Sequence, residues 1–289
     1  MQQIGERIHV ETSNRGSNNV IIETDDGLVL VDAPHRPSDA VRWGALVRAR
    51  GTVRYLVHTD HHIDHVLGNR WVPGTVVAHR RTRAHLLDGA APLEFIERSL
   101  AIIDPAGLEL LGGDNRVRLP EVTFDGRLTL HVGGVRLELQ HLGGHTDNTI
   151  ALLLPDEGVL VSGDNVIHDF GLPAFSDGDI HDHFAAFDAL ERLEFDTLIP
   201  GHGEVTDRSA IGAYRDQILV LLREIETAIA AGASRDEVAE TVRYEDRLHT
   251  ALDGEPGYPP DFVEYWQRAS QSTLYDQIVR RGPIATAAG

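Results

Sequence analysis

Residues 58–65 read His-Thr-Asp-His-His-Ile-Asp-His and directly follow a β-branched run with the composition of a buried strand. Alternate side chains of an extended stretch point the same way, so Asp60, His62 and Asp64 can converge. A turn after them would bring His65 into the same cavity. Because imidazole and carboxylate groups are ligands of transition metals, this stretch predicts a metal site at the end of a strand.

Three later segments each place one ligand-type residue beside glycine, where a strand is expected to end. They are Gly143-Gly144-His145-Thr146-Asp147, Ser162-Gly163-Asp164-Asn165 and Pro200-Gly201-His202-Gly203. Glycine permits close backbone turns, which would leave His145, Asp164 and His202 open to a cleft. The chain contains 16 histidines and no cysteine, so thiolate ligands, disulfides and a cysteine nucleophile are excluded.

Composition narrows the function further. Of the 289 residues, 42% are hydrophobic and 25% are charged, as in an ordinary globular protein. The formal net charge of −19 opposes binding to phosphate backbones and anionic membranes, so we expect a small-molecule substrate, no nucleic acid and no membrane. The first residues lack the basic and apolar layout of a signal peptide, which predicts a cytoplasmic protein. Composition leaves assembly into a homo-oligomer open.

The order of the expected elements indicates an α/β fold. A hairpin is expected over Val20 to Asp32 with its turn at Asp26-Gly27, followed by a helix from an N-cap at Ser38 to Arg50. Four short strands are expected between Arg127 and Ser162. Strands interleaved with helices in two blocks predict two sheets with helices outside them.

Two further regions are expected to differ from this core. Residues 90–120 are irregular in pattern apart from a short amphipathic helix over 93–103, which suggests an insertion or a lid. The end of the chain keeps apolar residues at helical spacing. We therefore expect a metal-binding domain over residues 1–204 and a helical C-terminal extension over 205–289 that packs on it.

The four chemistry-bearing segments together resemble the signature of the metallo-β-lactamase superfamily, His-x-His-x-Asp-His followed by a lone His, a lone Asp and a lone His. The resemblance runs from about Gly16 to Glu204. It implies an αββα sandwich of two mixed β-sheets with a dinuclear metal site at the sheet edges. The implied ligands are His62 and His145 for the first metal, Asp64, His65 and His202 for the second, and Asp164 as the bridge.

One position departs from the superfamily pattern, because Asp60 stands where the pattern begins with a histidine. His58 lies two residues too early, and His61 points to the opposite side of an extended chain. We expect Asp60 to bind the first metal as a carboxylate, with His58 as the alternative. Three carboxylates would reduce the charge of two divalent ions from about +4 to about +1, which favours harder ions. We expect two divalent ions per chain, zinc first, with manganese or iron as the alternatives.

The resemblance implies a hydrolase in which a hydroxide shared by the two metals attacks an electrophilic carbonyl or phosphoryl centre. Asp64 would orient the hydroxide and take its proton. An aspartate at position 164 resembles the glyoxalase-II-like and lactonase-like branches, since true β-lactamases lack this bridging carboxylate. We therefore expect a small ester, lactone, thioester or amide-like substrate. His168, Phe170 and Phe175 follow the bridging residue and are candidate substrate contacts.

Two other classes of function stay open. A non-hydrolytic iron enzyme, mononuclear or diiron and dioxygenase-like, would use a related scaffold, and the Asp60 carboxylate favours iron. A metal-binding module without catalysis would hold a single ion because of the change at position 60. The resemblance also suggests that Asp32 supports the metal loop, against the simpler interpretation of a turn residue at a strand end.

Overall fold

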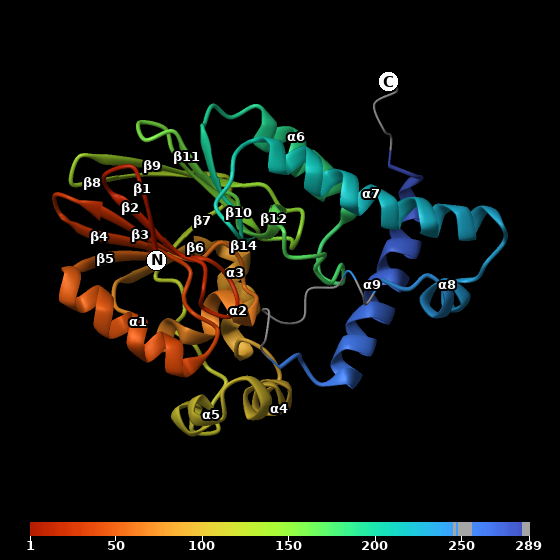
Figure 1. The fold of residues 1–289 in the computed structure, drawn as a ribbon, viewed down its shortest axis with the longest axis horizontal. Helices are drawn as coiled ribbons and strands as arrows, with labels where there is room; N and C mark the ends of the chain where they lie inside the picture. The colour runs from red at the N-terminus through yellow and green to blue at the C-terminus, as the bar shows by residue number, and fades with distance from the viewer. Residues whose placement is uncertain (245–246, 248–255, 285–289) are drawn as a thin grey trace.

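The structure is a computed structural model and describes residues 1–244, 247 and 256–284. Two β-sheets lie face to face, and helices cover their outer faces (Figure 1). This architecture confirms the αββα sandwich expected from the sequence. Within the described residues, no helix combines the length and apolar character that a bilayer crossing requires.

The first sheet contains seven strands in chain order. They are β1 (Gln2–Ile4), β2 (Ile8–Glu11), β3 (Asn19–Thr24), β4 (Gly27–Val31), β5 (Val53–Val57), β6 (Thr75–His79) and β7 (Val122–Phe124). β1 to β4 pair antiparallel and β4 to β7 pair parallel, so the sheet is mixed. The β3–β4 hairpin forms as predicted, but it turns at Asp25-Asp26, because Gly27 with φ +117° already pairs with Thr24.

The second sheet is also mixed. Its strands are β8 (Arg127–Val132), β9 (Val135–His141), β10 (Ile150–Leu154), β11 (Val159–Val161) and β13 (Thr197–Ile199). The first four pair antiparallel, and β13 pairs parallel with β11. A separate parallel pair joins β12 (Ile167–His168) to β14 (His202–Gly203). Between the two sheets, inward-facing side chains form one buried cluster that includes Val20, Ile22, Val29, Val31, Leu137, Leu139, Ile150 and Leu152.

Helices flank both sheets and extend beyond them. They are α1 (Pro37–Arg50), α2 (Ile63–Val66), α3 (Arg80–His85), α4 (Leu93–Ile103), α5 (Pro105–Leu111), α6 (Ile180–Glu191), α7 (Ser209–Ala230), α8 (Arg235–Thr241) and α9 (Pro260–Arg281). α1 covers the first sheet, where Trp43 and Val47 pack against Ile21, Leu30 and Leu56. The amphipathic helix predicted over residues 93–103 is α4.

Two local expectations were wrong for one common reason. Ser38 does not cap α1, whose N-cap is Arg36, and α5 is a helix where irregular chain was expected. The Asp104 carboxylate accepts hydrogen bonds from the backbone N–H of Ser38 at 2.9 Å and of Gly107 at 3.0 Å. One residue distant in sequence from α1 thus caps the first turn of two helices.

The C-terminal helices pack on the outer face of the second sheet. Leu160 and Leu198 of that sheet share one hydrophobic cluster with Ile211, Ile218 and Leu221 of α7. The same cluster includes Val238 of α8 and Leu274 and Ile278 of α9. The C-terminal extension over residues 205–289 is therefore mainly helical among the described residues, and α7, α8 and α9 all contribute side chains to this cluster. Parts of that range, 245–246, 248–255 and 285–289, lie outside the described residues.

Candidate active site

Strand ends from both sheets bring the expected ligands to one edge of the sandwich. The chain leaves β5, turns through residues 58–62 and enters α2, whose first turn carries Asp64 and His65. The other three follow strands of the second sheet: His145 after β9, Asp164 in a 3₁₀ turn after β11, and His202 after β13. A Cβ atom at Gly201 would lie 1.9 Å from Asp164 Oδ1, so this glycine permits the close approach of the last two loops.

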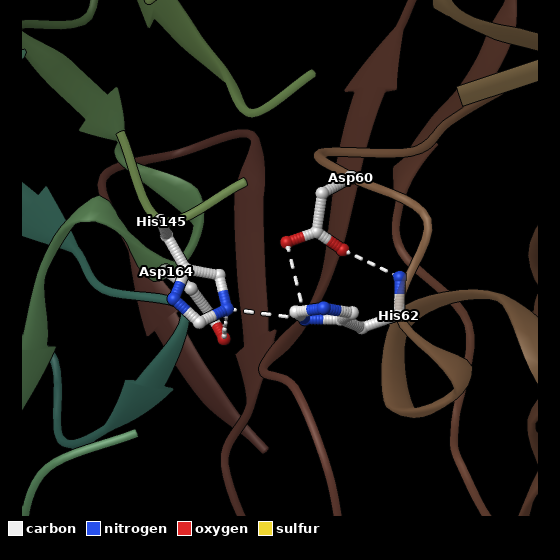
Figure 2. A group of neighbouring side chains, drawn as sticks. All are labelled: Asp60, His62, His145 and Asp164. Atoms are coloured by element: carbon white, nitrogen blue, oxygen red, sulfur yellow. Dashed lines mark hydrogen bonds and ion pairs between the residues drawn. The ribbon is translucent and has the colours of Figure 1, made fainter. Parts of the chain in front are cut away.

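The first group comprises Asp60, His62, His145 and Asp164, whose ligand atoms lie within 4.8 Å of one another. His145 Nε2 lies 3.1 Å from His62 Nδ1 and 3.5 Å from Asp164 Oδ2. The backbone N–H of His62 donates to Asp60 Oδ1 at 2.9 Å. Figure 2 shows the Asp60 carboxylate above the His62 ring, with the His145 ring to its left. The four side chains converge from both sheets of the sandwich.

The second group comprises Asp64, His65 and His202, again within 4.8 Å. His202 Nε2 lies 3.3 Å from Asp64 Oδ2 and 3.2 Å from Asp164 Oδ2. His65 Nε2 lies 3.3 Å from Asp164 Oδ1. Asp164 therefore faces histidines of both groups, as a bridging carboxylate requires.

The two neighbouring histidines of the motif lie outside these groups. His58 is fully buried, and its Nε2 lies 3.1 Å from the side-chain amide nitrogen of Asn69, which can only donate. His61 stacks on His85 with ring centres 4.1 Å apart. The structure thus brings Asp60 into the first group and leaves His58, its alternative, directed elsewhere.

Asp32 binds two residues of the 58–65 motif through its carboxylate. It is buried with φ +56°, and its carboxylate accepts from the backbone N–H of Thr59 at 2.9 Å and from the Thr59 hydroxyl at 2.6 Å. Its Oδ2 atom also lies 2.9 Å from His65 Nδ1. A carboxylate on the second ring nitrogen fixes the orientation and tautomer of a histidine that can bind metal through the other.

The groups form a largely buried cluster of carboxylates and imidazoles. Burial lowers the pKa of His62, but the Asp60 and Asp177 carboxylates raise it to about 9. Burial likewise opposes the charge of His202, yet Asp164 and Asp64 raise its pKa to about 10. Burial lowers the pKa of His145 to about 3. The carboxylates at this edge therefore stabilise positive charge, whether it is a proton or a metal cation.

The Asp60 side chain shows that a cation fits here. Its Oδ2 atom is buried and makes no hydrogen bond to any residue that the structure describes. That atom faces the group, 3.9 Å from His62 Nδ1. A buried carboxylate oxygen without a donor is costly, and a divalent ion would satisfy it. The set of imidazole nitrogens and carboxylate oxygens suits zinc, manganese or iron.

A cleft of about 1200 Å³ opens over the two groups. His62, Asp64 and His145 form part of its floor, and one wall comes from the C-terminal helix α9. Five aromatic side chains line this part of the cleft, and we call them the aromatic wall: Phe95 of α4, Tyr258 just before α9, and Phe262, Tyr265 and Trp266 of α9. Four of these rings are in contact: the ring centres of Phe95 and Phe262 lie 4.8 Å apart, and those of Tyr258 and Trp266 lie 5.0 Å apart. The cleft therefore joins a charged floor to an apolar wall.

The expected substrate contacts lie elsewhere. His168 has a ring nitrogen 3.1 Å from the carbonyl oxygen of Glu204. Phe170 stacks on His202 with ring centres 5.5 Å apart, and Phe175 is buried near Tyr244. None of the three is among the described residues that line the cleft. Other residues of the same segment do line the cleft, among them Ile167, Pro173 and Asp177.

Two residues that line the cleft were not predicted from the sequence. Asp177 places Oδ2 3.0 Å from His62 Nε2. Arg15 is nearly buried, and its guanidinium lies 4.8 Å from the centre of the Tyr258 ring. Nothing in the local sequence marks either residue, since both reach the cleft only through tertiary contacts.

The sequence profile of the metallo-beta-lactamase superfamily matches residues 13–202. The chain belongs to this superfamily, as its motifs indicated. Membership supports a metal-dependent hydrolase.

Two curated relatives share limited identity. The chain is 24% identical over 290 residues to a linear primary-alkylsulfatase of Pseudomonas sp. (strain ATCC 19151), covering 87% of this chain and 53% of that protein. It is 34% identical over 77 residues to a beta-lactamase-like protein 2 homolog of Caenorhabditis elegans, covering 27% of this chain and 25% of that protein. The chain spans about half the length of the first relative and matches a quarter of the second.

Solved structures share the fold. A metallo-beta-lactamase from Pontibacter korlensis has a TM-score of 0.54 at 22% identity, over 73% of this chain and 94% of that one. The sec-alkyl sulfatase PisA1 from Pseudomonas sp., as a double mutant, has a TM-score of 0.65 at 18% identity, over 98% of this chain and 50% of that one. The second similarity extends into the C-terminal helices.

Proposed function

We propose that this protein is a dinuclear metallohydrolase that cleaves a small ester, lactone, thioester or amide-like bond. The observation that carries the proposal is the pair of histidine–carboxylate groups at the floor of the cleft, with Asp164 between them. Asp60, His62 and His145 would hold the first ion, and Asp64, His65 and His202 the second. Zinc is the proposed metal, with manganese or iron as alternatives.

The chain's own residues suit this chemistry. When bound, two such ions lower the pKa of water and polarise a substrate oxygen. Of the three carboxylates in the two ligand groups, Asp64 is the most open, with 23% of its side chain exposed against 5% for Asp164 and 0% for Asp60. It can therefore accept a proton during the reaction, while Asp60 and Asp164 remain enclosed.

The cleft wall indicates the kind of substrate. Tyr265 lies on the cleft side of α9 and has 68% of its surface exposed. Exposed aromatic side chains in a concave site gain free energy by covering apolar groups. We propose that the substrate carries an apolar substituent that contacts this wall.

The test combines metal content with turnover. The parent and an Asp60→Ala variant are purified without added metal and analysed for metal, with Asp25→Ala, an exposed position, as the matched control. We expect about two ions per chain in the parent and the control and about one in Asp60→Ala. Hydrolysis of phenyl esters, lactones and thioesters should be present in the parent and strongly reduced in Asp60→Ala.

Other outcomes would select the alternatives. One ion in both the parent and Asp60→Ala, without turnover, would favour a metal-binding module and contradict the dinuclear proposal. Bound iron with visible absorption and no hydrolysis would favour a non-hydrolytic, dioxygenase-like enzyme, since zinc and manganese(II) sites are nearly colourless.

A second candidate reaction is the cleavage of a sulfate ester. Its support is the PisA1 similarity, which continues through 98% of this chain, whereas the Pontibacter enzyme matches 73%. Arg15 also places a cation in the cleft wall, where an anionic ester could bind. Alkyl sulfates therefore belong in the same substrate screen, and turnover of them without turnover of carboxylic esters would replace the first proposal.

A further inference from the structure

The C-terminal helix α9 buries an unusual set of polar side chains. Gln267, Ser270, Gln271 and Gln277 are all at most 7% exposed. Buried polar groups are costly unless they are hydrogen-bonded, so such a face needs polar partners. Two of these residues bind the backbone of the loop between β12 and α6.

The contacts fasten this loop at several points. The backbone N–H of Phe175 donates to Ser270 Oγ at 2.8 Å, and that of Ile180 donates to Gln277 Oε1 at 2.8 Å. Gln277 Nε2 donates in turn to the carbonyl oxygen of Gly178, also at 2.8 Å. Residues 175–180 are therefore held by α9 through hydrogen bonds to their main chain, and the Asp179 side chain adds ion pairs with Arg280 and Arg281.

The other side of the same loop lies against the first ligand group. Asp177 Oδ2 is 3.0 Å from His62 Nε2, while the other ring nitrogen of His62 faces Asp60 and His145. At Gly178, a Cβ atom would lie 2.0 Å from the carbonyl oxygen of Gly144 and 2.4 Å from that of His145. The loop thus touches two residues of the first group through a carboxylate and through a glycine.

We propose that α9 is a positioning element for the first metal site. Ser270 and Gln277 hold the loop so that Asp177 orients the His62 ring, with Nδ1 toward the metal, and keeps the His145 turn in place. A carboxylate that accepts from the second ring nitrogen fixes the tautomer and raises the basicity of the ligand. The second group, Asp64, His65 and His202, takes its support from Asp32 and lies outside this linkage.

This inference rests on the proposed function, because it concerns the metal affinity of the proposed site. Metal-stripped full-length protein is titrated with Zn²⁺ in competition with a chelating dye, which gives the stoichiometry and both affinities. The variants are Asp177→Asn and Gln277→Ala. The matched control is Gln271→Ala, which changes a fully buried glutamine of α9 that has no hydrogen bond to any described residue. Thermal unfolding verifies that each variant is folded.

The expected result is a selective loss. Asp177→Asn should weaken one of the two Zn²⁺ affinities about 10- to 100-fold and leave the other unchanged. Gln277→Ala should weaken the same affinity several-fold, and Gln271→Ala should change neither. In an Asp60→Ala background, which lacks the first group's own carboxylate, Asp177→Asn should have no further effect.

Three results would overturn the proposal in distinguishable ways. Two unchanged Zn²⁺ affinities in folded Asp177→Asn would end the positioning role while leaving the hydrolase proposal intact. Three ions in the parent and two in Asp177→Asn would make Asp177 a direct ligand with His61 and His62, whose atoms also lie within 4.8 Å of it. No Zn²⁺ binding by the parent would remove the proposed function itself.

Discussion

Asp32 is the residue whose role is most sharply defined by its conformation. Its left-handed φ of +56° is unfavourable for most residues but tolerated by aspartate and asparagine. Asp32→Asn therefore preserves the backbone and removes the charge that faces His65. We expect the Zn²⁺ affinity of the second group to fall about 10- to 100-fold, measured by the same competition titration.

Asp169 provides the control for this change. It is the other non-glycine residue with positive φ among those described, at +52°, and its side chain is 79% exposed. Asp169→Asn should leave both affinities unchanged. A weaker second site in Asp169→Asn, or an unaltered one in Asp32→Asn, would show that the Asp32 carboxylate does not support His65.

His79 gives a pH-dependent contribution to stability. Burial, and then the neighbouring His141 ring 3.9 Å away, lower its pKa to about 4. Since the unfolded pKa is about 6.5, the unfolded chain binds more protons between these values, and the folded state loses stability as pH falls through that window. As the pH falls through this window, the free energy of unfolding of the wild type should decrease by on the order of 2 kcal/mol more than that of His79→Asn.

The comparison uses urea unfolding at a series of pH values. Asparagine can still accept the hydrogen bond that His79 Nδ1 takes from the backbone N–H of Arg81 at the start of α3. The His79→Asn variant thus removes the titration and keeps the cap. Parallel pH curves for the two proteins would contradict this assignment.

At the scale of elements, the Asp104 side chain links α1 and α5, two helices that no local sequence pattern connects. Its carboxylate accepts from the first-turn N–H of Ser38 in α1 and from that of Gly107 in α5, and the Ser38 hydroxyl adds a bond of 2.7 Å. Asp104→Ala should lower the free energy of unfolding by about 2–3 kcal/mol, because it removes two caps.

Urea denaturation measures this loss. Ser38→Ala should cost less, since only the hydroxyl contact disappears, and Asp88→Ala at an exposed position should cost almost nothing. If Asp104→Ala and Asp88→Ala unfolded at the same urea concentration, the shared cap would contribute nothing to stability.

At the scale of the whole molecule, the cleft exists because the C-terminal helices meet the sandwich. Arg98 of α4 bonds Asp261 of α9 at 2.8 Å and lies 4.4 Å from the centre of the Phe262 ring. These contacts set the aromatic wall opposite the ligand groups. If the wall binds the substrate, kcat/KM for phenyl acetate, butyrate, hexanoate and octanoate should rise by up to about fourfold per methylene.

Tyr265→Ala should reduce the rise of kcat/KM with acyl chain length. It should leave kcat/KM for phenyl acetate unchanged, because only the longer chains reach the wall. Tyr275→Ala changes a half-buried tyrosine of the same helix that is not among the described residues lining the cleft, so the series should keep its slope. A flat series in the parent, or equal slopes in the parent and Tyr265→Ala, would exclude the wall as a substrate contact.

Local patterns by themselves determined the architecture and the candidate ligands. Residues 58–65 follow a strand directly, and each remaining ligand sits beside glycine at another strand end. These positions depend on strand periodicity and turn chemistry, which act over a few residues. The two sheets with outer helices and the hairpin of β3 and β4 follow from such patterns, whereas the resemblance of the motifs to the metallo-β-lactamase signature implied the αββα sandwich and the family. The choice of Asp60 over His58 remained open until their side chains were placed.

Only the tertiary structure decided what surrounds those ligands. Asp177 lies 115 residues from His62, and Gln277 lies 97 residues from Ile180. The aromatic wall, the shared Asp104 cap and the burial of Phe175 also arise from segments that meet only in the folded chain. Such contacts depend on how whole helices pack on the second sheet, and their residues carry no local periodicity or turn signal. Short-range chemistry thus defines the candidate metal ligands, whereas long-range packing defines their support and the shape of the cleft.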